Sequence, residues 1–247
     1  YIENISILDE QEESQSKPTT IEILQDKIIS LRSAITDAHS SPTEETLSIL
    51  EDSYENLFDV PVKYSFNKYK RVVQEISRSF GKKVKFTLGG DQGSLKKEQL
   101  SLLNDSMIHL VRNSLDHGLE TPEERVSNGK DEIGQLEIIC FQKDEELEIL
   151  IRDDGKGINL KSVLDKAIEK GIIDPSKANS LTKDETYALI FQPNFSTRKE
   201  VSEISGRGVG MDVVKQNLDQ MKGVIKINSE LGKGTEISLK IPVPKVD

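Results

Sequence analysis

The chain has 247 residues, of which 35% are hydrophobic and 31% charged, and its formal net charge is −10. This length suggests one large domain, or one domain with an appendage, and is sufficient to bury a sizeable core. The acidic balance argues against nucleic-acid binding, which relies on basic side chains to neutralise phosphates. No apolar run is long enough for a membrane span, and the single cysteine, Cys140, excludes an internal disulfide and a cysteine-rich zinc site.

The first segment, residues 1–19, predicts a solvated leader or linker. It is rich in acidic residues, serine and glutamine, and its first basic residue is Lys17. An acidic docking tail is the alternative, although most charge runs are simply solvated. The chain starts at Tyr1 and shows no signal peptide. We therefore expect a piece of a longer polypeptide that works in a reducing compartment, the cytoplasm.

Residues 20–59 predict two amphipathic helices joined by a short connection. The apolar residues recur at intervals of three and four, which places them on one helical stripe: Ile21, Leu24, Ile28, Leu31 and Ile35, then Leu47, Leu50, Tyr54 and Leu57. Between the two stripes, Pro42 ends the first helix and Thr43 suits the start of the second. Such an antiparallel hairpin would either pack on the following domain or pair with a second hairpin in a four-helix dimer core.

From residue 60 to residue 247 the pattern changes to mixed helices and strands. Helices are predicted at 66–80, 95–117, 160–170, 183–191 and 209–221, and strands at 83–88, 135–142, 146–152, 223–229 and 235–241. Strands grouped as antiparallel neighbours, with helices on one side, predict an α+β two-layer sandwich. Cys140, inside the strand pattern LEIICF, is expected to be a small core residue.

The first polar motif lies in the helix predicted at 95–117. His109, Asn113 and His117 are spaced four residues apart, so they share one helical face, and Arg112 and Asp116 flank them. A polar stripe of this kind needs partners. The amide oxygen of asparagine is a hard ligand of the kind that Mg²⁺ accepts beside phosphate oxygens.

The second motif, Asp153 to Gly157 (DDGKG), directly follows a predicted strand. An ionised carboxylate at a strand end can accept a hydrogen bond from an exocyclic amine such as that of adenine. Glycine would let a ligand approach the backbone closely. The pattern DxGxG alone is also typical of an ordinary Asp-Gly turn.

The third motif, GRGVGMD at residues 206–212, precedes an amphipathic helix. A glycine-rich loop that enters a helix presents free N–H groups to a phosphate. The spacing GxGxG is not that of a dinucleotide-binding fingerprint, and no Walker A motif occurs. The sequence therefore favours a nucleotide site whose purine and phosphate contacts are divided between the second and third motifs.

These motifs, in this order, resemble the GHKL ATPase superfamily, and more closely the kinase core of CheA-type chemotaxis histidine kinases. The resemblance rests on HLVRNSLDHGLETPEER (109–125), IRDDGKGIN (151–159), IFQPNFSTRKEVSEISGRGVGMDVVK (190–215) and GKGTEISLKIP (232–242), and it extends back to residue 60. It implies the Bergerat ATP-binding fold, preceded by a dimerisation hairpin that looks short here.

The resemblance also implies roles for individual residues. Asn113 would ligate a Mg²⁺ ion that bridges the ATP phosphates, with His117 nearby as a second metal-site and catalytic residue. Asp153 would receive the adenine amine, and residues 160–205 would form an ATP lid that becomes ordered only around nucleotide. The remaining cofactor contacts implied by the resemblance are Arg112, Asp116, Gly155, Gly157, Ser196, Arg198, Gly206, Gly208, Gly210 and Thr235. Asn194 stands where the family commonly has glycine, and we expect it to tolerate a positive φ.

The implied reaction is transfer of the γ-phosphoryl group of ATP to a histidine on a separate phosphotransfer domain, with a response regulator downstream and a receptor or adaptor upstream. His109, whose unperturbed pKa lies near neutrality, could orient or deprotonate the incoming imidazole. His39 lies at the hairpin turn and is not expected to be the phosphoacceptor. Two alternatives remain: a pseudokinase or dimeric scaffold that binds ATP without phosphotransfer, and a GHKL ATPase or serine kinase with another target.

Overall fold

The computed structural model describes residues 2–6, 20–90, 93–195 and 210–243, with backbone alone at 2–6, 20–24, 55–56 and 66–67. The chain divides into two compact units, Tyr1–Val60 and Pro61–Asp247. The short strand β3 (Val60–Pro61) spans the boundary between them.

The first unit begins with two strands that the sequence did not predict. Strand β1 (Ile2–Ser6) pairs antiparallel with β2 (Thr20–Leu24), and helix α1 then runs from Gln25 to Ser40. The first helix therefore begins at Gln25 and not near Ile21. The stretch Thr20–Leu24 contains three β-branched residues, which favour an extended backbone over a helix.

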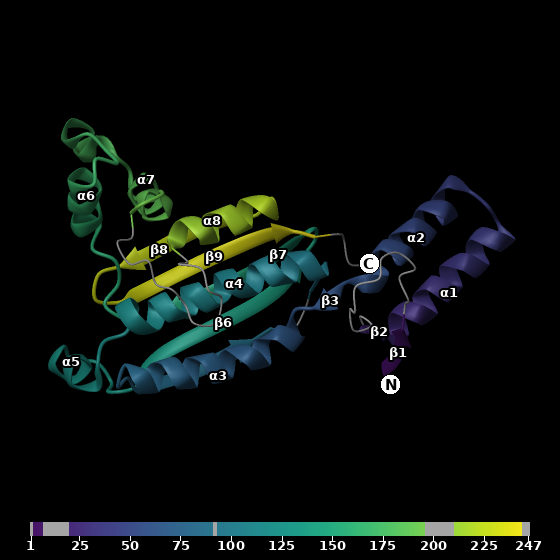
Figure 1. Ribbon diagram of the computed structural model, residues 1–247, viewed down its shortest axis with the longest axis horizontal. Coiled ribbons are helices and arrows are strands. Elements are labelled where there is room, and N and C mark those ends of the chain that lie inside the picture. Colours follow the sequence, from purple (N-terminus) through teal and green to yellow (C-terminus); the bar gives the residue numbers. More distant parts are fainter. Residues whose placement is uncertain (1, 7–19, 91–92, 196–209, 244–247) are drawn as a thin grey trace, which may run out of the picture. The chain divides into compact units, whose positions relative to one another are not determined.

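Helix α2 (Glu44–Glu55) follows α1 after a tight connection and ends in the 3₁₀ turn η1 (Asn56–Phe58). Thr43 caps α2, because its Oγ1 accepts from the N–H of Thr46, while Oγ1 of Thr46 accepts from the N–H of Thr43. The two helices contact each other along their length (Figure 1). The hairpin leaves large apolar side chains exposed: Ile29, Ile35, Leu47, Ile49 and Tyr54.

The second unit contains a five-stranded sheet in the order β4-β6-β7-β9-β8. The strands are β4 (Val84–Gly89), β6 (Gly134–Lys143), β7 (Glu146–Asp153), β8 (Val224–Glu230) and β9 (Gly234–Pro242). Three neighbouring pairs are antiparallel, as predicted, but β4 runs parallel to β6. The sequence did not predict this parallel pair, because hydrophobic alternation reports which face a strand buries and not the direction of its neighbour.

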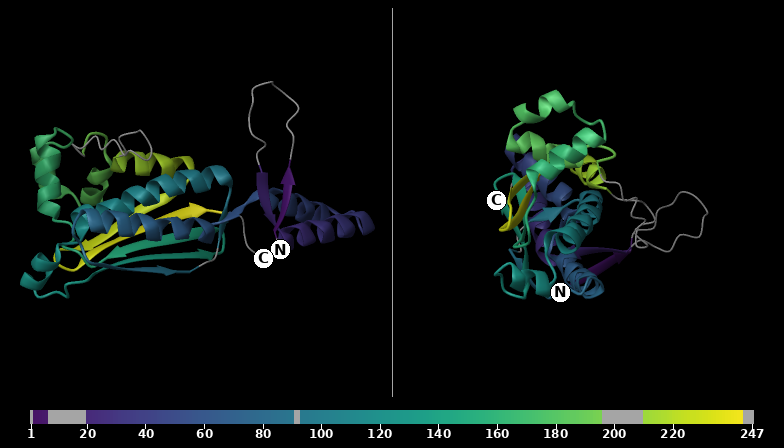
Figure 2. Two further views of the ribbon diagram at one scale, coloured as in Figure 1. Left: turned by 60° about the horizontal axis from the view of Figure 1, so that its bottom comes forward. Right: turned by 90° about the vertical axis from the view of Figure 1, so that its left-hand side faces the viewer.

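Helices α3 (Lys63–Ser79), α4 (Lys97–Asn113) and α8 (Met211–Gln220) cover one face of this sheet. Figure 2 shows the same two layers from other directions. Alternate strand residues point into the layer between sheet and helices, where Leu136, Ile138 and Cys140 of β6 are buried. The predicted α+β two-layer sandwich and the core position of Cys140 are confirmed. Among the described helices, none combines the length and apolar character that crossing a bilayer requires.

Helix α4 ends in a feature that the sequence did not predict, the π-helical turn η2 (Ser114–Gly118). Such turns hold one residue more than an α-helical turn and often occur at functional sites. Lys82 donates from Nζ to the carbonyl oxygens of Leu115 and Asp116, at 2.5 and 2.7 Å. Helix α5 (Pro122–Ser127) follows, and the two-residue strand β5 (Ser94–Leu95) precedes α4.

A small helical group lies between β7 and α8 in the chain. It consists of α6 (Leu160–Glu169), η3 (Pro175–Ser180), α7 (Lys183–Ala188) and η4 (Leu189–Phe191). Val163, Ala167, Leu189 and Phe195 form its own hydrophobic core. The expectation that all of 160–205 becomes ordered only around nucleotide was therefore too broad, since residues 160–195 already pack against one another; 196–205 lie outside the described residues. Asn194 adopts a φ of 66°, as predicted.

Candidate functional site

A cavity of about 630 Å³ lies in the second unit, at the end of α4. Its walls come from α4 and η2, the end of β7, helix α6, the start of α8 and strands β8 and β9. Six of the predicted site residues line it: His109, Asn113, His117, Asp153, Gly157 and Thr235. The fold thus brings together residues that are up to 126 positions apart in the sequence.

Asp153 lines this cavity at the end of β7. It accepts hydrogen bonds from the N–H of Gly155, at 3.1 Å, and from the side chain of Ser114. Burial raises the pKa of the Asp153 carboxyl, while the hydrogen bonds from Gly155, Ser114 and the Thr235 backbone act in the opposite direction. A buried acceptor at a strand end is suited to reading a donor group on a flat ring.

The two glycines of the DxGxG motif have different roles in the structure. Gly157 lines the cavity with a φ of 70°, and a Cβ there would lie 2.2 Å from the carbonyl oxygen of Glu230. Gly155 is buried, and a Cβ there would lie 2.2 Å from the carbonyl oxygen of Gly118. The close contact between the loop after β7 and the end of η2 therefore requires glycine at position 155, whether or not this residue also touches a ligand.

The helical wall of the cavity carries the polar stripe that the sequence predicted. His109 and Asn113 come from α4 and His117 from η2, and all three face the same cavity. The Asn113 amide donates from Nδ2 to the sulfur of Met211, at 2.9 Å, which connects α4 to the first residue of α8. His117 is largely exposed and lies 3.5 Å from the Asp116 carboxylate.

A second polar network, which sequence reasoning missed, fixes the side of the cavity opposite α4. Oγ of Ser229, which is buried, accepts from the N–H of Ile158 at 2.9 Å and donates to the carbonyl oxygen of Gly234 at 2.8 Å. It also lies 3.0 Å from Oγ1 of Thr235. The hydroxyl of Tyr187, from α7, donates to the carbonyl oxygen of Ser229. A serine within an alternating strand gives no signal in the sequence, so only the fold reveals this role.

Not every predicted residue reaches the cavity. Arg112 and Asp116 are half-buried but do not line it, as far as the described residues define its walls. Gly210 is the N-cap of α8, next to the lining residue Met211. The predicted contacts Ser196, Arg198, Gly206 and Gly208 lie outside the described residues.

In the described part of the chain, no group of three or more His, Cys, Asp or Glu residues is placed to hold a metal ion. An ion at this site would have to share its ligands with a bound substrate. The donor set fits Mg²⁺, which usually keeps few protein ligands and takes phosphate oxygens in addition.

Comparisons with known proteins identify the family of this chain. Residues 102–245 match the family model for histidine kinase-, DNA gyrase B- and HSP90-like ATPases. The chain is similar to sensor histidine kinase CheAY of Helicobacter pylori, with 44% identity over 183 residues, covering 74% of this chain and 23% of the relative. It is 37% identical to chemotaxis protein CheA of Bacillus subtilis over 188 residues, covering 76% of this chain and 28% of the relative.

The gliding motility regulatory protein of Myxococcus xanthus is 39% identical over 183 residues, 74% of this chain and 24% of that protein. Among solved structures, the chain is similar to the histidine kinase domain of a blue-light activated histidine kinase from Erythrobacter litoralis. That similarity has a TM-score of 0.43 at 13% identity and covers 86% of this chain and 82% of the other.

The chain spans about a quarter of the length of the curated relatives it matches. The family model, in contrast, matches more than half of the chain and includes its cavity-lining residues from His109 to Ile237. Its sequence relatives include CheA proteins, and the chain belongs to the family of histidine kinase-, DNA gyrase B- and HSP90-like ATPases.

Proposed function

We propose that this chain is the kinase core of a CheA-like histidine kinase, which binds Mg-ATP and transfers its γ-phosphoryl group to a histidine on a separate phosphotransfer domain. One observation supports the proposal: the half-buried Asp153 lines the same cavity as Asn113 and His117. The same cavity therefore holds an acceptor suited to the adenine amine and a helix with amide and imidazole groups.

At the purine end, Asp153 accepts the hydrogen bond from the exocyclic amine of adenine. Thr235 lies beside it, connected to Ser229, and Gly157 gives the ring access to the backbone. Ile158 and Ile237 provide apolar surface in the same wall. This combination of one buried acceptor with apolar surroundings is typical of sites that recognise a planar base.

At the phosphate end, Asn113 supplies an amide oxygen to Mg²⁺, with His117 close by. Helix α8 begins at Met211 in the cavity wall, and no described side chain caps its first N–H groups. Such a helix start attracts phosphate oxygens through its N–H groups and dipole. By resemblance, Ser196, Arg198, Gly206, Gly208 and Gly210 belong to the same phosphate end, and Arg112 and Asp116 are further predicted cofactor contacts.

The chemistry requires positioning and charge neutralisation more than covalent help. Bound Mg²⁺ would supply the neutralisation of phosphate charge, and the helix holds the nucleotide. His109 lies in the cavity wall one turn before Asn113, where it can orient or deprotonate the incoming imidazole. Replacing His109 by alanine should leave ATP binding intact and slow phosphotransfer; an unchanged transfer rate would remove His109 from the mechanism.

The hairpin of the first unit is proposed to form a homodimer by pairing with a second copy. Its exposed apolar side chains support this, since Ile29 and Tyr54 are 60% and 61% exposed. An isolated hairpin buries only one seam, and a four-helix core would cover the rest. By resemblance, the proposal also includes a receptor or adaptor upstream, a response regulator downstream, and a location in the cytoplasm.

The test is calorimetric titration of the purified chain with ATP, with and without Mg²⁺, followed by transfer from radiolabelled ATP to a candidate phosphotransfer domain. Binding that requires Mg²⁺ and fails in Asp153→Asn, together with label on a histidine of the acceptor, is the expected result. Binding without transfer would favour the pseudokinase alternative, and phosphate release without an acceptor would favour an ATPase. Absence of any binding heat would contradict the site itself.

A further inference from the structure

A buried ionic network lies directly behind the purine end of the cavity. Its centre is Arg125 of helix α5, which is 1% exposed. Its guanidinium group donates to both carboxylate oxygens of Asp154, at 3.0 and 2.8 Å, and to Glu120 at 3.3 Å. Its Nε donates to the carbonyl oxygen of Asp131, at 2.6 Å.

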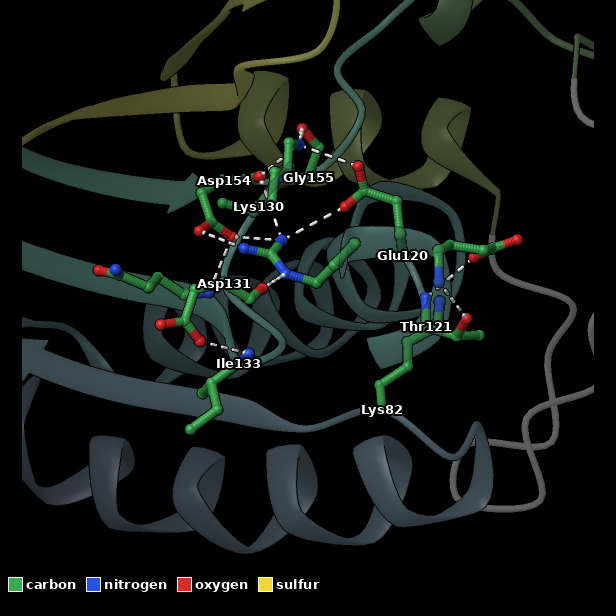
Figure 3. A network of polar contacts seen from close by, with 12 residues as sticks. Lys82, Glu120, Thr121, Lys130, Asp131, Ile133, Asp154 and Gly155 are labelled. Atoms are coloured by element: carbon green, nitrogen blue, oxygen red, sulfur yellow. Dashed lines mark hydrogen bonds and ion pairs between the residues drawn. The ribbon is translucent and has the colours of Figure 1, made fainter. Parts of the chain in front are cut away.

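Lys130 extends this network onto the backbone of the DxGxG loop. Its Nζ donates to the carbonyl oxygens of Asp154 and Gly155, at 2.9 and 2.7 Å, and to Glu120 at 2.9 Å. Figure 3 shows Lys130, Glu120, Asp154 and Gly155 gathered in this network. Two cations thus face two carboxylates, so the charges of the network balance.

None of these four side chains lines the cavity as the described residues define it. They hold instead the residue that follows Asp153 in the chain. The Asp154 carboxylate is fixed further by the N–H of Gln135, at 2.8 Å. Because burying a charged network is costly and rarely adds stability over an apolar core, a role in holding the loop accounts for it better than stability alone.

We infer that Arg125 is a positioning residue for purine recognition: through Asp154 it fixes the loop that carries Asp153, so that the acceptor stays aligned with the adenine amine. The network includes Glu120, which follows η2, and the last residue of η2, Gly118, contacts Gly155 and accepts from the N–H of Lys156 at 2.9 Å. The strand end that carries Asp153 and the helix that carries Asn113 are thereby held in fixed relation.

The geometry of arginine is essential to this role. A planar guanidinium group binds both oxygens of one carboxylate at once, whereas a lysine ammonium acts as a single point charge. Without Arg125, Asp154 would lose its bidentate partner one residue from Asp153. Rotation of the loop would then misalign the Asp153 acceptor, and the unpaired negative charge of Asp154 would oppose ionisation of Asp153.

The test compares ATP with inosine triphosphate, which carries a carbonyl oxygen in place of the adenine amine. This inference rests on the proposed function, under which the wild-type chain prefers ATP by about tenfold or more, the scale of one hydrogen bond to a charged group. In Arg125→Met we expect the preference to fall at least about threefold, towards equal affinity for the two nucleotides. Affinity for inorganic tripolyphosphate, which lacks the base, should be unchanged.

Two control variants separate positioning from general destabilisation. Arg152→Met removes an exposed arginine that pairs with Glu236, one residue before Asp153 in the chain, and should keep the ATP preference. Leu147→Ala opens a cavity at the far end of the same strand, where Leu147 is fully buried. It should lower the melting temperature without changing the preference.

A double variant keeps the inference testable if Arg125→Met alone fails to fold. Arg125→Met combined with Asp154→Asn removes the unpaired charge, so the melting temperature should recover relative to Arg125→Met while the ATP preference stays low. A folded Arg125 variant with the wild-type ratio of ATP to inosine triphosphate affinity would overturn the inference and leave the proposed function standing. A wild-type chain without ATP preference would instead overturn the proposed function.

Discussion

Substitution of Gly155 by alanine tests the contact that joins the two walls of the cavity. The change adds one methyl group at a position whose backbone conformation alanine can adopt, so conformational strain does not enter. The new Cβ would lie 2.2 Å from the carbonyl oxygen of Gly118 and 2.8 Å from the amide nitrogen of Leu119. Both atoms belong to the backbone, so neither can rotate away.

The size of the effect follows from the distances. Ordinary contact begins at 3.4 Å, so the two backbones must separate by about 1.2 Å. Overpacking of this kind costs about 1–3 kcal/mol, which corresponds to about 2–4 °C of melting temperature per kcal/mol in a unit of this size. A shift of about 1 Å at a binding site can cost about a hundredfold in function, so ATP affinity should fall far more than stability.

The assay is thermal melting combined with calorimetric titration of ATP. The matched control is Gly89→Ala in the same sheet, where a Cβ would meet Ile139 at 3.7 Å, an ordinary contact. We expect this control to bind ATP normally and to be as stable as wild type or about 0.4–1 kcal/mol more stable. Normal ATP affinity in Gly155→Ala would refute the argument that this contact sets the geometry of the site.

Three further predictions concern other parts of the molecule. Because burial raises the pKa of the Asp153 carboxyl, the folded chain binds the carboxyl proton more tightly than the unfolded chain does, and this stabilisation is full below the ordinary carboxyl pKa and lost as pH rises through the raised value. Asp153→Asn should therefore melt at a higher temperature than wild type near neutral pH but not in acid, and a lower melting temperature at neutral pH would contradict the raised pKa. Ser229→Ala leaves the N–H of Ile158 without its acceptor and should lower the free energy of unfolding in denaturant by about 1–3 kcal/mol. The control Ser238→Ala removes a half-buried serine of β9 that donates to Glu148 and should change this free energy by about 0.5 kcal/mol or less. Equal losses in the two variants would contradict the role of Ser229 in fixing the cavity wall. A chain that starts at Pro61 should elute as a monomer in size-exclusion chromatography while the full chain elutes as a dimer, and identical elution would contradict pairing through the hairpin.

The sequence predicted the sheet strands and the lining of the cavity well, because both leave strong local signals. Strands β7 and β9 alternate apolar and polar residues without interruption, and their positions were predicted to within about two residues. The stripe of His109, Asn113 and His117 follows helical spacing, and it survives the π turn with all three residues in the cavity wall.

Features that depend on contacts between distant segments were missed. Arg125 belongs to a string of charged residues, and charge normally predicts exposure, yet the fold buries it against Asp154. The parallel pairing of β4 with β6 depends on the path of the chain through α4 and α5, which periodicity does not reveal. Helix α5 could have been predicted, since Thr121 and Glu124 form a capping box with Pro122 at the first helical position.

The π turn at Ser114–Gly118 has a consequence for how length changes would be tolerated here. A π-helical turn takes five residues through nearly the rotation that an α-helix covers in four, at about 100° per residue. Deleting one residue from Ser114–Gly118 would therefore restore regular helix with little change in the direction of the residues that follow. The wide turn itself would be lost, and with it the pair of carbonyl oxygens, of Leu115 and Asp116, that accept from Lys82. The extra residue thus serves the anchoring of this turn by Lys82 more than the direction of the chain beyond it.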